Sequence, residues 1–414
     1  MMSGGFSAEW MGVRWNMSER KSMKLSDCCL SIADGDHQPP PKSENGIPFV
    51  TISNITANNT FDFSDTLFVP QDYYDSLDNK RKARKDDVLY SVVGSFGIPV
   101  LMKENKAFVF QRHIAILKPD PEAIVPGFLY YTMRSKEFYA KADAAAIGAA
   151  QRTVSLNALR NMEISLPELK TQKRIADILS VYDSLIETNQ RQIKLLEEAA
   201  QRLYKEWFVD LRYPGHENVP VVDGVPEGWE KKTVDELCEK TRDTVSPNDI
   251  PPGTPYIGLE HIPRHDFCLS EWGNASDVTS SKAQYKRNDI IFGQIRPYFH
   301  KVGFAITDGV ASTDSFIMTP RNDIWGLFLM TVFSEAFVNF SYQTCKEGAK
   351  MPRADWNQMR QYPIIIANTN TQQAFEERIR NIAEEVRILA LQNKELSEAR
   401  DRLLPKLMSG EIAV

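Results

Sequence analysis

Apolar residues recur with a heptad period along one uninterrupted stretch of the chain, from Thr171 to about Val209. The stretch contains no Pro or Gly and is rich in Leu, Glu, Lys, Gln and Ala, which favour helices. Its apolar positions alternate four and three residues apart, and only Asn189 interrupts them. About 38 residues at roughly 1.5 Å each predict one helix about 55 Å long. A helix of that length with a narrow apolar stripe needs a partner along its whole length.

A second stretch with the same pattern begins at Thr371 and has Asn393 at one position of its stripe. The two stretches and the segments before them match at an offset of 200 residues, without a gap. The identical pairs include Gly148/Gly348, Ala149/Ala349, Asn157/Asn357, Arg160/Arg360, Ile164/Ile364, Thr171/Thr371, Gln172/Gln372, Leu196/Leu396 and Leu203/Leu403. The chain is therefore a tandem repeat of one structural plan.

The two interrupting asparagines indicate how the helices pair. If the helices run antiparallel with Asn189 facing Asn393, both ends of the stripe also match, in the pairs Ile175–Leu407 and Trp207–Phe375. Parallel pairing in register would set each asparagine against an aliphatic residue. Since a buried polar residue can fix the register of paired helices at some cost in stability, we predict the antiparallel pair with Asn189 close to Asn393. The alternative is that each asparagine faces solvent or a partner subunit.

The segments before each long helix carry the signals of α+β domains. Strands are predicted at 47–52, 88–93 and 114–117, a tight turn at 94–97 and a helix at 125–140. We therefore predict two α+β domains with mixed, largely antiparallel curved sheets, separated by an antiparallel coiled coil with approximate two-fold symmetry. The predicted boundaries are domain 1 at 1–167, helix 1 at 168–212, a linker at 213–228, domain 2 at 229–366, and helix 2 with the C-terminal tail at 367–414.

Composition narrows the class of protein only slightly. The chain has 414 residues and a net charge of −6, so nucleic-acid binding has to rest on local clusters of basic residues. Five cysteines without CxxC spacing indicate a reducing compartment, and no apolar run is long enough to span a bilayer. We expect a cytoplasmic protein.

The order of motifs resembles a known family. A variable domain precedes a heptad helix that opens on residues 172–176 (QKRIA) and ends near Trp207–Phe208; residues 226–229 (PEGW) then lead to a second variable domain and helix. The segments 289–292 (DIIF), 296–298 (RPY), 309–314 (GVASTD) and 407–412 (LMSGEI) also fit. In this order they resemble the specificity (S) subunit of type I restriction-modification enzymes, over nearly the whole chain.

That resemblance implies a subunit without catalytic activity. Each variable domain would be a target recognition domain reading one half of an asymmetric bipartite site in double-stranded DNA. The helices would set the spacing and dock two methyltransferase subunits, and restriction/translocase subunits would join through those. S-adenosylmethionine, ATP and Mg would bind to the partner subunits, and no cofactor is expected in this chain.

Candidate DNA contacts are basic residues beside hydrogen-bonding groups in loops, since phosphate contacts position a protein and base edges specify the sequence. In the first domain the candidates are Lys80, Arg81, Lys82, Arg84, Lys85, Arg112, Gly148, Gln151 and Arg152. In the second domain they are Lys282, Lys286, Arg287, Arg296, Lys301, Lys346, Gly348, Lys350 and Arg353. The two glycines would permit close approach of the backbone. A run of solvated charges is the alternative for each residue.

Partner docking is predicted at the end of the first long helix, where Tyr204, Trp207 and Phe208 supply more aromatic surface than one stripe needs. Other chemistry is not indicated. His261, His265 and Cys268 lack a fourth metal ligand, and Pro263 prevents a helical pair of ligands, so no metal site is expected. The P-loop and the Asn/Asp-Pro-Pro-Tyr/Phe loop of an adenine methyltransferase are both missing.

Two other classes of function remain open at this point. A coiled-coil adaptor could present two protein-binding modules without any DNA. A self-contained restriction–methylation enzyme is disfavoured by the missing methyltransferase loop. Divergent domains on a shared scaffold favour two different ligands, but their pattern does not identify the target bases, the spacer length, which domain reads which half, or whether the complex restricts or only methylates.

Overall fold

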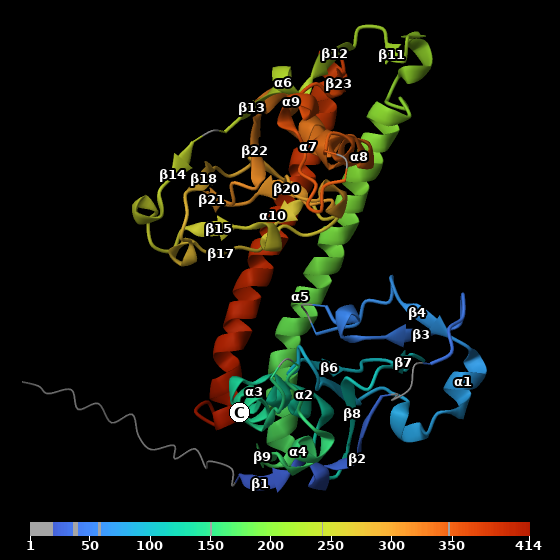
Figure 1. The fold of residues 1–414 in the computed structure, drawn as a ribbon, viewed down its shortest axis with the longest axis vertical. Helices are drawn as coiled ribbons and strands as arrows, with labels where there is room; N and C mark the ends of the chain where they lie inside the picture. Colours follow the sequence, from blue (N-terminus) through green and yellow to red (C-terminus); the bar gives the residue numbers. More distant parts are fainter. Residues whose placement is uncertain (1–19, 36–39, 57–58, 150, 242, 347) are drawn as a thin grey trace, which may run out of the picture. The chain divides into compact units, whose positions relative to one another are not determined.

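The structure is a computed structural model that describes residues 20–35, 40–56, 59–149, 151–241, 243–346 and 348–414 (Figure 1). The chain divides into two compact units. Unit 1 comprises Met1–Ser184 and Ser397–Val414, and unit 2 comprises Leu185–Leu396. The two long helices, α5 (Leu169–Tyr204) and α10 (Thr369–Ser409), each contribute residues to both units.

In the described part of unit 1, short strands alternate with four short α-helices before α5 begins. Its elements are β1 (Lys21–Lys24), β2 (Cys29–Asp34), β3 (Ile47–Val50), β4 (Leu67–Val69), α1 (Gln71–Ser76), β5 (Val88–Ser91), β6 (Pro99–Leu101), β7 (Val109–Phe110), β8 (Ile114–Pro119), α2 (Pro126–Arg134), α3 (Lys136–Ala145), α4 (Leu156–Asn161) and β9 (Glu163–Leu166).

The main sheet of unit 1 is buried on both faces. Its strand order is β2-β8-β5-β6, all antiparallel, and a smaller sheet has the order β4-β3-β7 with β3 and β7 parallel. Side chains alternate between the faces of a strand. Val88 and Tyr90 of β5 accordingly enter the core shared with α2 and α3, whereas Leu89 enters a second core with Val50 and Phe108. The antiparallel strand pair β1–β9 completes the unit.

Unit 2 repeats this plan with more strands. Its elements before α10 are β10 (Val221–Val222), β11 (Val225–Pro226), β12 (Glu230–Thr233), α6 (Val234–Leu237), β13 (Cys238–Lys240), β14 (Thr244–Val245), β15 (Pro255–Ile257), β16 (Cys268–Leu269), β17 (Gly273–Asn274), β18 (Lys282–Tyr285), β19 (Ile290–Gly293), β20 (Val302–Ala305), β21 (Gly309–Ala311), β22 (Ser315–Pro320), α7 (Trp325–Phe333), α8 (Glu335–Gln343), α9 (Trp356–Met359) and β23 (Pro363–Ile366).

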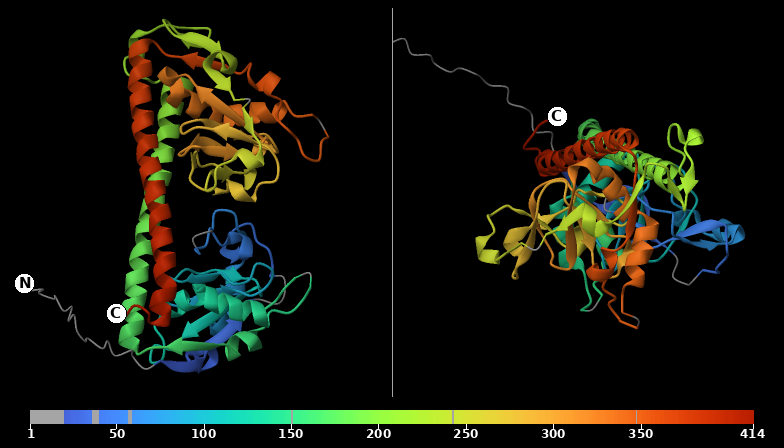
Figure 2. Two further views of the ribbon diagram at one scale, coloured as in Figure 1. Left: turned by 90° about the vertical axis from the view of Figure 1, so that its left-hand side faces the viewer. Right: turned by 90° about the horizontal axis from the view of Figure 1, so that it is seen from above.

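Two five-stranded sheets form the body of unit 2, with strand orders β13-β22-β19-β20-β16 and β14-β18-β21-β15-β17. Only the pairs β15–β21 and β16–β20 are parallel within them. Both units are therefore α+β with mixed, largely antiparallel sheets, which confirms the predicted fold class. Figure 2 shows the sheets and short helices of each unit lying against its segments of α5 and α10.

Matching positions in the two units do the same structural work. Ser135 and Ser334 each accept a hydrogen bond from a backbone N–H three residues on, which caps α3 and α8. Gly127 of α2 and Gly326 of α7 lie where a Cβ would meet a long helix, 3.0 Å from Ala176 and 2.8 Å from Ile379. The repeat seen in the sequence is thus a repeat of helix caps and close helix crossings.

The predicted helix at 125–140 is wrong in detail, because the chain forms two helices. Ser135 has an extended backbone (φ −67, ψ 148) and ends α2 while capping α3. The first long helix also ends earlier than predicted, with a π-helical turn at Lys205–Val209 after α5. Residues 1–19 lie outside the described residues, and Lys21–Lys24 forms β1 against β9.

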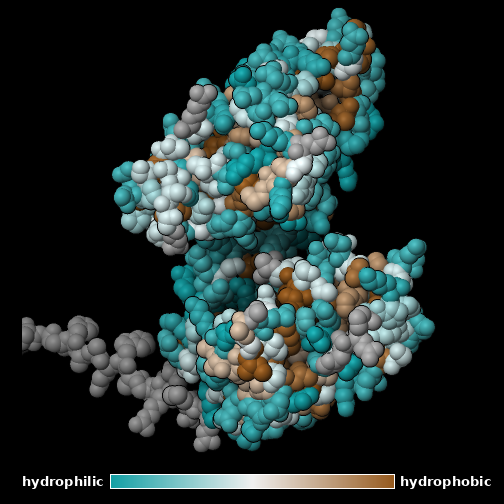
Figure 3. All heavy atoms as spheres, viewed as in Figure 1, coloured by the Kyte–Doolittle hydropathy of each residue, from teal (hydrophilic) through white to brown (hydrophobic). Residues whose placement is uncertain are grey.

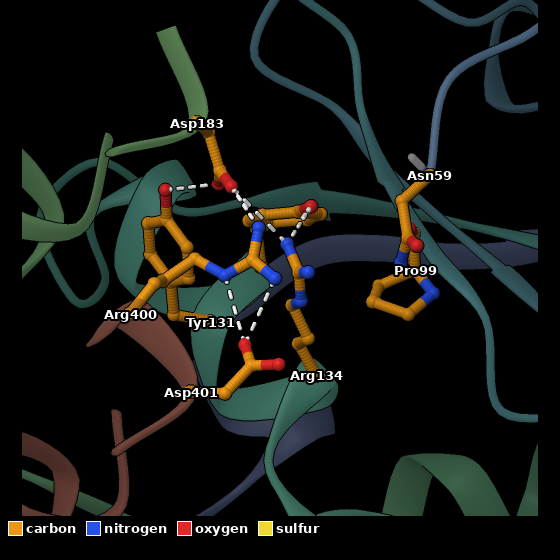
Figure 4. Close-up of polar contacts among 8 residues, drawn as sticks. Asn59, Pro99, Tyr131, Arg134, Asp183, Arg400 and Asp401 are labelled. Carbon is orange, nitrogen blue, oxygen red and sulfur yellow. Dashed lines mark hydrogen bonds and ion pairs between the residues drawn. The ribbon is translucent and has the colours of Figure 1, made fainter. Parts of the chain in front are cut away.

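Within unit 1, a buried polar cluster joins the helices. Arg400 of α10 forms an ion pair with Asp183 of α5, with Nη1 and Oδ1 2.6 Å apart. The hydroxyl of Tyr131 donates to Asp183 at 2.6 Å, and Arg134 approaches the same carboxylate at 3.4 Å (Figure 4). Arg400 also forms an ion pair with Asp401, its neighbour in sequence.

Within unit 2, the start of α10 packs against the end of the first long helix. The rings of Trp207 and Phe375 lie 5.8 Å apart, and those of Phe208 and Phe375 4.7 Å apart. This contact confirms the predicted Trp207–Phe375 pair. The Oδ1 atom of Asn393 is buried and lacks a hydrogen-bond partner among the described residues. A hydrogen bond from Asn189 to that atom is therefore not formed, and the proximity of the two asparagines stays a prediction.

Among the described residues, no single helix has the length and apolar composition to cross a membrane. The bent pair Asn322–Phe333 and Glu335–Gln343 passes that test jointly, by length and composition alone. Every residue of α7, within that pair, is buried.

Candidate nucleic-acid interface

In unit 1, two glycine-containing loops lie side by side. The turn 94–97 closes the β5–β6 hairpin, as predicted, and the loop 147–153 leads to α4. The backbone N–H of Gly94 donates to the carbonyl of Arg152 at 2.9 Å, and bridges join Thr153 to Val93 and Ile147. We call these two segments loop pair 1.

The chemistry of loop pair 1 is partly committed to contacts within the unit. The guanidinium of Arg152 pairs with the carboxylate of Asp143 and lies 5.5 Å from the centre of the Phe96 ring. Gln151 is exposed. Gly148 has φ +105, and a Cβ there would lie 2.6 Å from the carbonyl oxygen of Gln151. Glycine is thus required by the turn itself, and among the described residues of the pair Ser95 and Gln151 present exposed polar side chains.

The corresponding segments of unit 2 also meet. The backbone N–H of Arg296 donates to the carbonyl of Pro352 at 2.8 Å, and a bridge joins Ile295 to Arg353. The Arg353 guanidinium forms an ion pair with Asp314 at 2.7 Å. We call the segments 294–298 and 345–354, as far as they are described, loop pair 2.

Loop pair 2 presents more basic surface than loop pair 1. Lys346 and Lys350 are exposed, and a Cβ on Gly348 would meet no atom within 4 Å. Beside them lies a pair of exposed aromatic rings, Tyr298 and Tyr342, in edge-to-face contact at 5.4 Å. The contact between these tyrosines was not predictable from the sequence, because 44 residues separate them and the packing of α8 on the 3-10 turn Pro297–Phe299 brings them together.

The predicted basic run 80–85 has a different position in unit 1. Part of it forms a 3-10 helix, Asn79–Arg81, which is capped by Asp78. The Nζ atom of Lys82 donates to the carbonyl of Asp75 at 2.9 Å, and the side chain of Arg84 donates to Asn79 at 3.2 Å. Lys80, Arg84, Lys85 and Arg112 are exposed. The run therefore packs beside β2 and keeps some of its charges in solvent.

Three candidates in unit 2 are engaged in contacts within the unit. Lys282 is only 7% exposed and donates to the carbonyl and hydroxyl of Ser280, so the expectation of an open DNA-contacting side chain there is wrong. Lys301 donates to the carbonyl of Leu259, and burial lowers the pKa of its ammonium group. Arg287 forms an ion pair with Glu384 of α10 at 3.0 Å, whereas Lys286 is exposed.

The predicted aromatic docking surface is also corrected. Trp207 and Phe208 are 6% and 7% exposed and belong to the core of unit 2, together with Tyr213, Trp229 and Phe375. Tyr204 is half-buried, and burial raises its pKa to about 12. These aromatic side chains are buried within unit 2, because the segment after α5 folds back onto the end of that helix.

Apolar side chains remain exposed elsewhere on α5. In the part of α5 that belongs to unit 2, Leu185 and Leu195 are 46% and 59% exposed, and their spacing places them on one side of the helix. Figure 3 shows mostly hydrophilic residues in its view, interrupted by patches of hydrophobic residues. The exposure of Leu185 and Leu195 could have been inferred from the sequence, because both lie outside the heptad stripe.

Comparison with known proteins agrees with the geometry. Residues 17–198 match the family described as "Type I restriction modification DNA specificity domain". The HindI specificity subunit of Haemophilus influenzae is 23% identical, and the alignment covers 96% of this chain and 100% of that protein. The MjaIX specificity subunit of Methanocaldococcus jannaschii is 24% identical over 71% of this chain and 70% of that protein.

A solved structure shares the fold. The type I S subunit of M. genitalium superposes with a TM-score of 0.58, at 14% identity, covering 96% of this chain and 98% of that chain. With the tandem repeat and the two loop pairs, these findings describe a chain with two α+β units built on one structural plan. Over nearly its whole length the chain is similar to specificity subunits of type I restriction-modification systems, and residues 17–198 match the DNA specificity domain of that family.

Proposed function

We propose that this chain is the non-catalytic DNA-sequence-reading subunit of a type I restriction-modification complex, with each unit reading one half of an asymmetric bipartite site. The observation that carries the proposal is the pair of matched units whose scaffolds agree while their exposed loops differ. The adaptor without DNA is not favoured, because the relatives are DNA-specificity subunits.

The partners and cofactors follow from this role. We propose that two methyltransferase subunits dock on the helices, with restriction/translocase subunits joining through them, in the cytoplasm. S-adenosylmethionine, ATP and Mg would bind to those partners. The exposed residues Leu185 and Leu195 are better candidates for docking than the buried aromatics. Changing both residues to Glu should abolish co-purification with the methyltransferase, whereas Leu67→Glu, at a comparably exposed strand position, should not.

Methylome sequencing tests the main proposal. A strain carrying this gene and its partner methyltransferase should show adenine methylation at one bipartite motif, and deletion of the gene should remove it. Exchanging residues 229–366 for the same segment of a relative should change one half of the motif and leave the other half intact. An unchanged motif, or loss of both halves in a complex that still assembles, would contradict the assignment of one half to each unit.

Charge reversal tests the role of loop pair 2. The double change Lys346→Glu and Lys350→Glu should weaken binding of the assembled complex to its cognate site. If both lysines contact phosphates, the salt dependence of the binding constant should become shallower by about two ion equivalents. Lys231→Glu, at an exposed position of β12, serves as the control. Equal salt dependence in the double variant and the wild type would remove these lysines from the interface.

A further inference from the structure

Three potential metal ligands from distant segments meet in unit 2. They are His265 in the loop before β16, His300 in the turn before β20, and Glu335 at the start of α8. The Nδ1 atom of His300 lies 3.0 Å from Oε1 of Glu335, and Nδ1 of His265 lies 3.6 Å from the same oxygen. One ligand atom from each residue lies within 4.8 Å of the other two.

The 3.0 Å separation is that of a hydrogen bond between His300 and Glu335, which a cation bound to both atoms would replace. Zinc binds imidazole nitrogen and carboxylate oxygen at about 2.0–2.2 Å, which places neighbouring ligand atoms roughly 3.3–3.5 Å apart in a tetrahedron. The two measured separations fall on either side of that range. Small shifts of the exposed Glu335 and His265 side chains would complete the geometry, because both are more than 60% exposed.

The state of His300 favours a metal ligand. The residue is 3% exposed. Its other nitrogen, Nε2, is buried and has no hydrogen-bond partner among the described residues. Ligation through Nδ1 would leave the proton on Nε2, so that each ring nitrogen has one role.

The backbone holds two of the ligands together before any cation binds. The N–H of His265 donates to the carbonyl of His300 at 3.3 Å, and the two rings lie 4.5 Å apart. Glu335 is held at the capped first turn of α8. The exposed side of the cluster leaves room for water to complete the coordination.

We propose that His265, His300 and Glu335 form a site for a divalent transition metal of the zinc type, with water as a further ligand. The bound ion would join α8 to the turn that carries Arg296 and Tyr298, and so stiffen one side of loop pair 2. Unit 1 lacks the site, because α3 begins with Lys136 where α8 begins with Glu335. The proposal concerns metal binding by the chain itself and does not depend on DNA recognition.

A zinc titration of the purified full-length chain tests the proposal. After removal of metal with a chelator, competition with a chromophoric zinc indicator should reveal one site per chain. His265→Ala and Glu335→Gln, both at exposed positions, should each weaken that site by about tenfold or more. His261→Ala and His216→Ala should leave it unchanged. Hydrogen exchange of residues 296–301 should slow when zinc binds to the wild type, but not when it is added to His265→Ala.

Cobalt(II) substitution distinguishes this site from the five free cysteines, since thiolate ligation gives intense charge-transfer absorption that nitrogen and oxygen ligands do not. The expected spectrum lacks that absorption. The proposal is overturned if no stoichiometric zinc binds, if both exposed variants bind as tightly as the wild type, or if the cobalt spectrum shows thiolate ligation.

Discussion

The contacts made by the long helices are polar at one position of unit 1 and apolar at the corresponding position of unit 2. In unit 1 the ion pair of Asp183 and Arg400 lies buried between the long helices. The positions that correspond to them in the repeat are Ala383 and Ala200 in unit 2, which are 4% and 0% exposed. The contacting short helices differ in the same sense, since α2 brings Tyr131 and Arg134 to the ion pair while α7 is buried along its whole length.

The two units therefore share the geometry of their helix crossings, but the side-chain interactions at these crossings differ. A buried ion pair is weak support for stability, but it specifies its partner strictly, because a wrong pairing leaves a buried charge. The apolar contacts of unit 2 define the pairing of the helices less strictly and tolerate more substitutions. We therefore assign the fixing of helix register in unit 1 to Asp183 and Arg400 as a hypothesis, beside the predicted role of Asn189 and Asn393.

The loop pairs show the same divergence at the surface. In loop pair 1 Arg152 pairs with Asp143 and covers Phe96, whereas in loop pair 2 Arg353, which corresponds to Thr153 in the repeat, pairs with Asp314. Only loop pair 2 adds exposed lysines and the exposed pair Tyr298 and Tyr342. Two such surfaces on matched backbones are what the reading of two unrelated half-sites requires.

The largest effect is expected when the buried ion pair of unit 1 is broken. Asp183→Ala should lower the free energy of unfolding of unit 1 by about 3–5 kcal/mol, because Arg400 and Tyr131 lose their buried partner. The double change Asp183→Ala and Arg400→Ala, which copies the alanine pair of unit 2, should cost at least about 1 kcal/mol less than the sum of the single changes. Urea unfolding followed by hydrogen exchange in α2 measures this; additive costs would show that the two residues act independently.

The next effect is a pH dependence confined to unit 2. The carboxylate of Glu197 accepts hydrogen bonds from the backbone of Phe267 and Cys268, and burial, reinforced by Asp266, raises its pKa to about 8. An unfolded Glu ionises near pH 4.3, so between these values the folded state binds the extra proton and stability falls as pH rises. Unit 1 has Ser397 at the corresponding position.

Glu197→Gln should remove much of the decrease in the free energy of unfolding of unit 2 with rising pH. The raised pKa of Asp266 leaves a smaller decrease in the same direction. Tryptophan fluorescence reports it selectively once Trp10 and Trp15, which precede the described residues, are replaced by Phe, since the other five tryptophans lie in unit 2. Unfolding between pH 5 and 8.5 provides the measurement. The same slope in wild type and variant would rule out Glu197 as its source.

The smallest effect separates the two loop glycines. Gly148→Ala places a Cβ 2.6 Å from a backbone oxygen at φ +105 and should destabilise unit 1 by about 1–3 kcal/mol. Gly348→Ala has open space around it at φ +74 and should cost only about 1 kcal/mol, the penalty of the left-handed conformation. Thermal unfolding of both variants compares the units directly, and equal costs would mean that the loops relax in the same way.

Local chemistry was sufficient to predict the repeat, the long helices, the α+β class and the hairpin at 94–97 from the sequence. Heptad spacing, β-branched runs and paired glycines act over a few residues, so they are legible without a structure. The pairing of Trp207 with Phe375 was also predictable, because a regular helix propagates register over its whole length.

The exposure of individual side chains, and the contacts between distant ones, became clear from the tertiary structure alone. Contacts between segments apart in the chain bury Lys282, Trp207 and Phe208. Such contacts also pair Arg152 with Asp143 and Arg353 with Asp314, and they bring His265 together with His300 and Glu335. Sequence patterns record the face of an element, but they do not record which other element covers it. Exposure and ligand geometry are properties of the packed chain, and for that reason the candidate site had to be read from the fold.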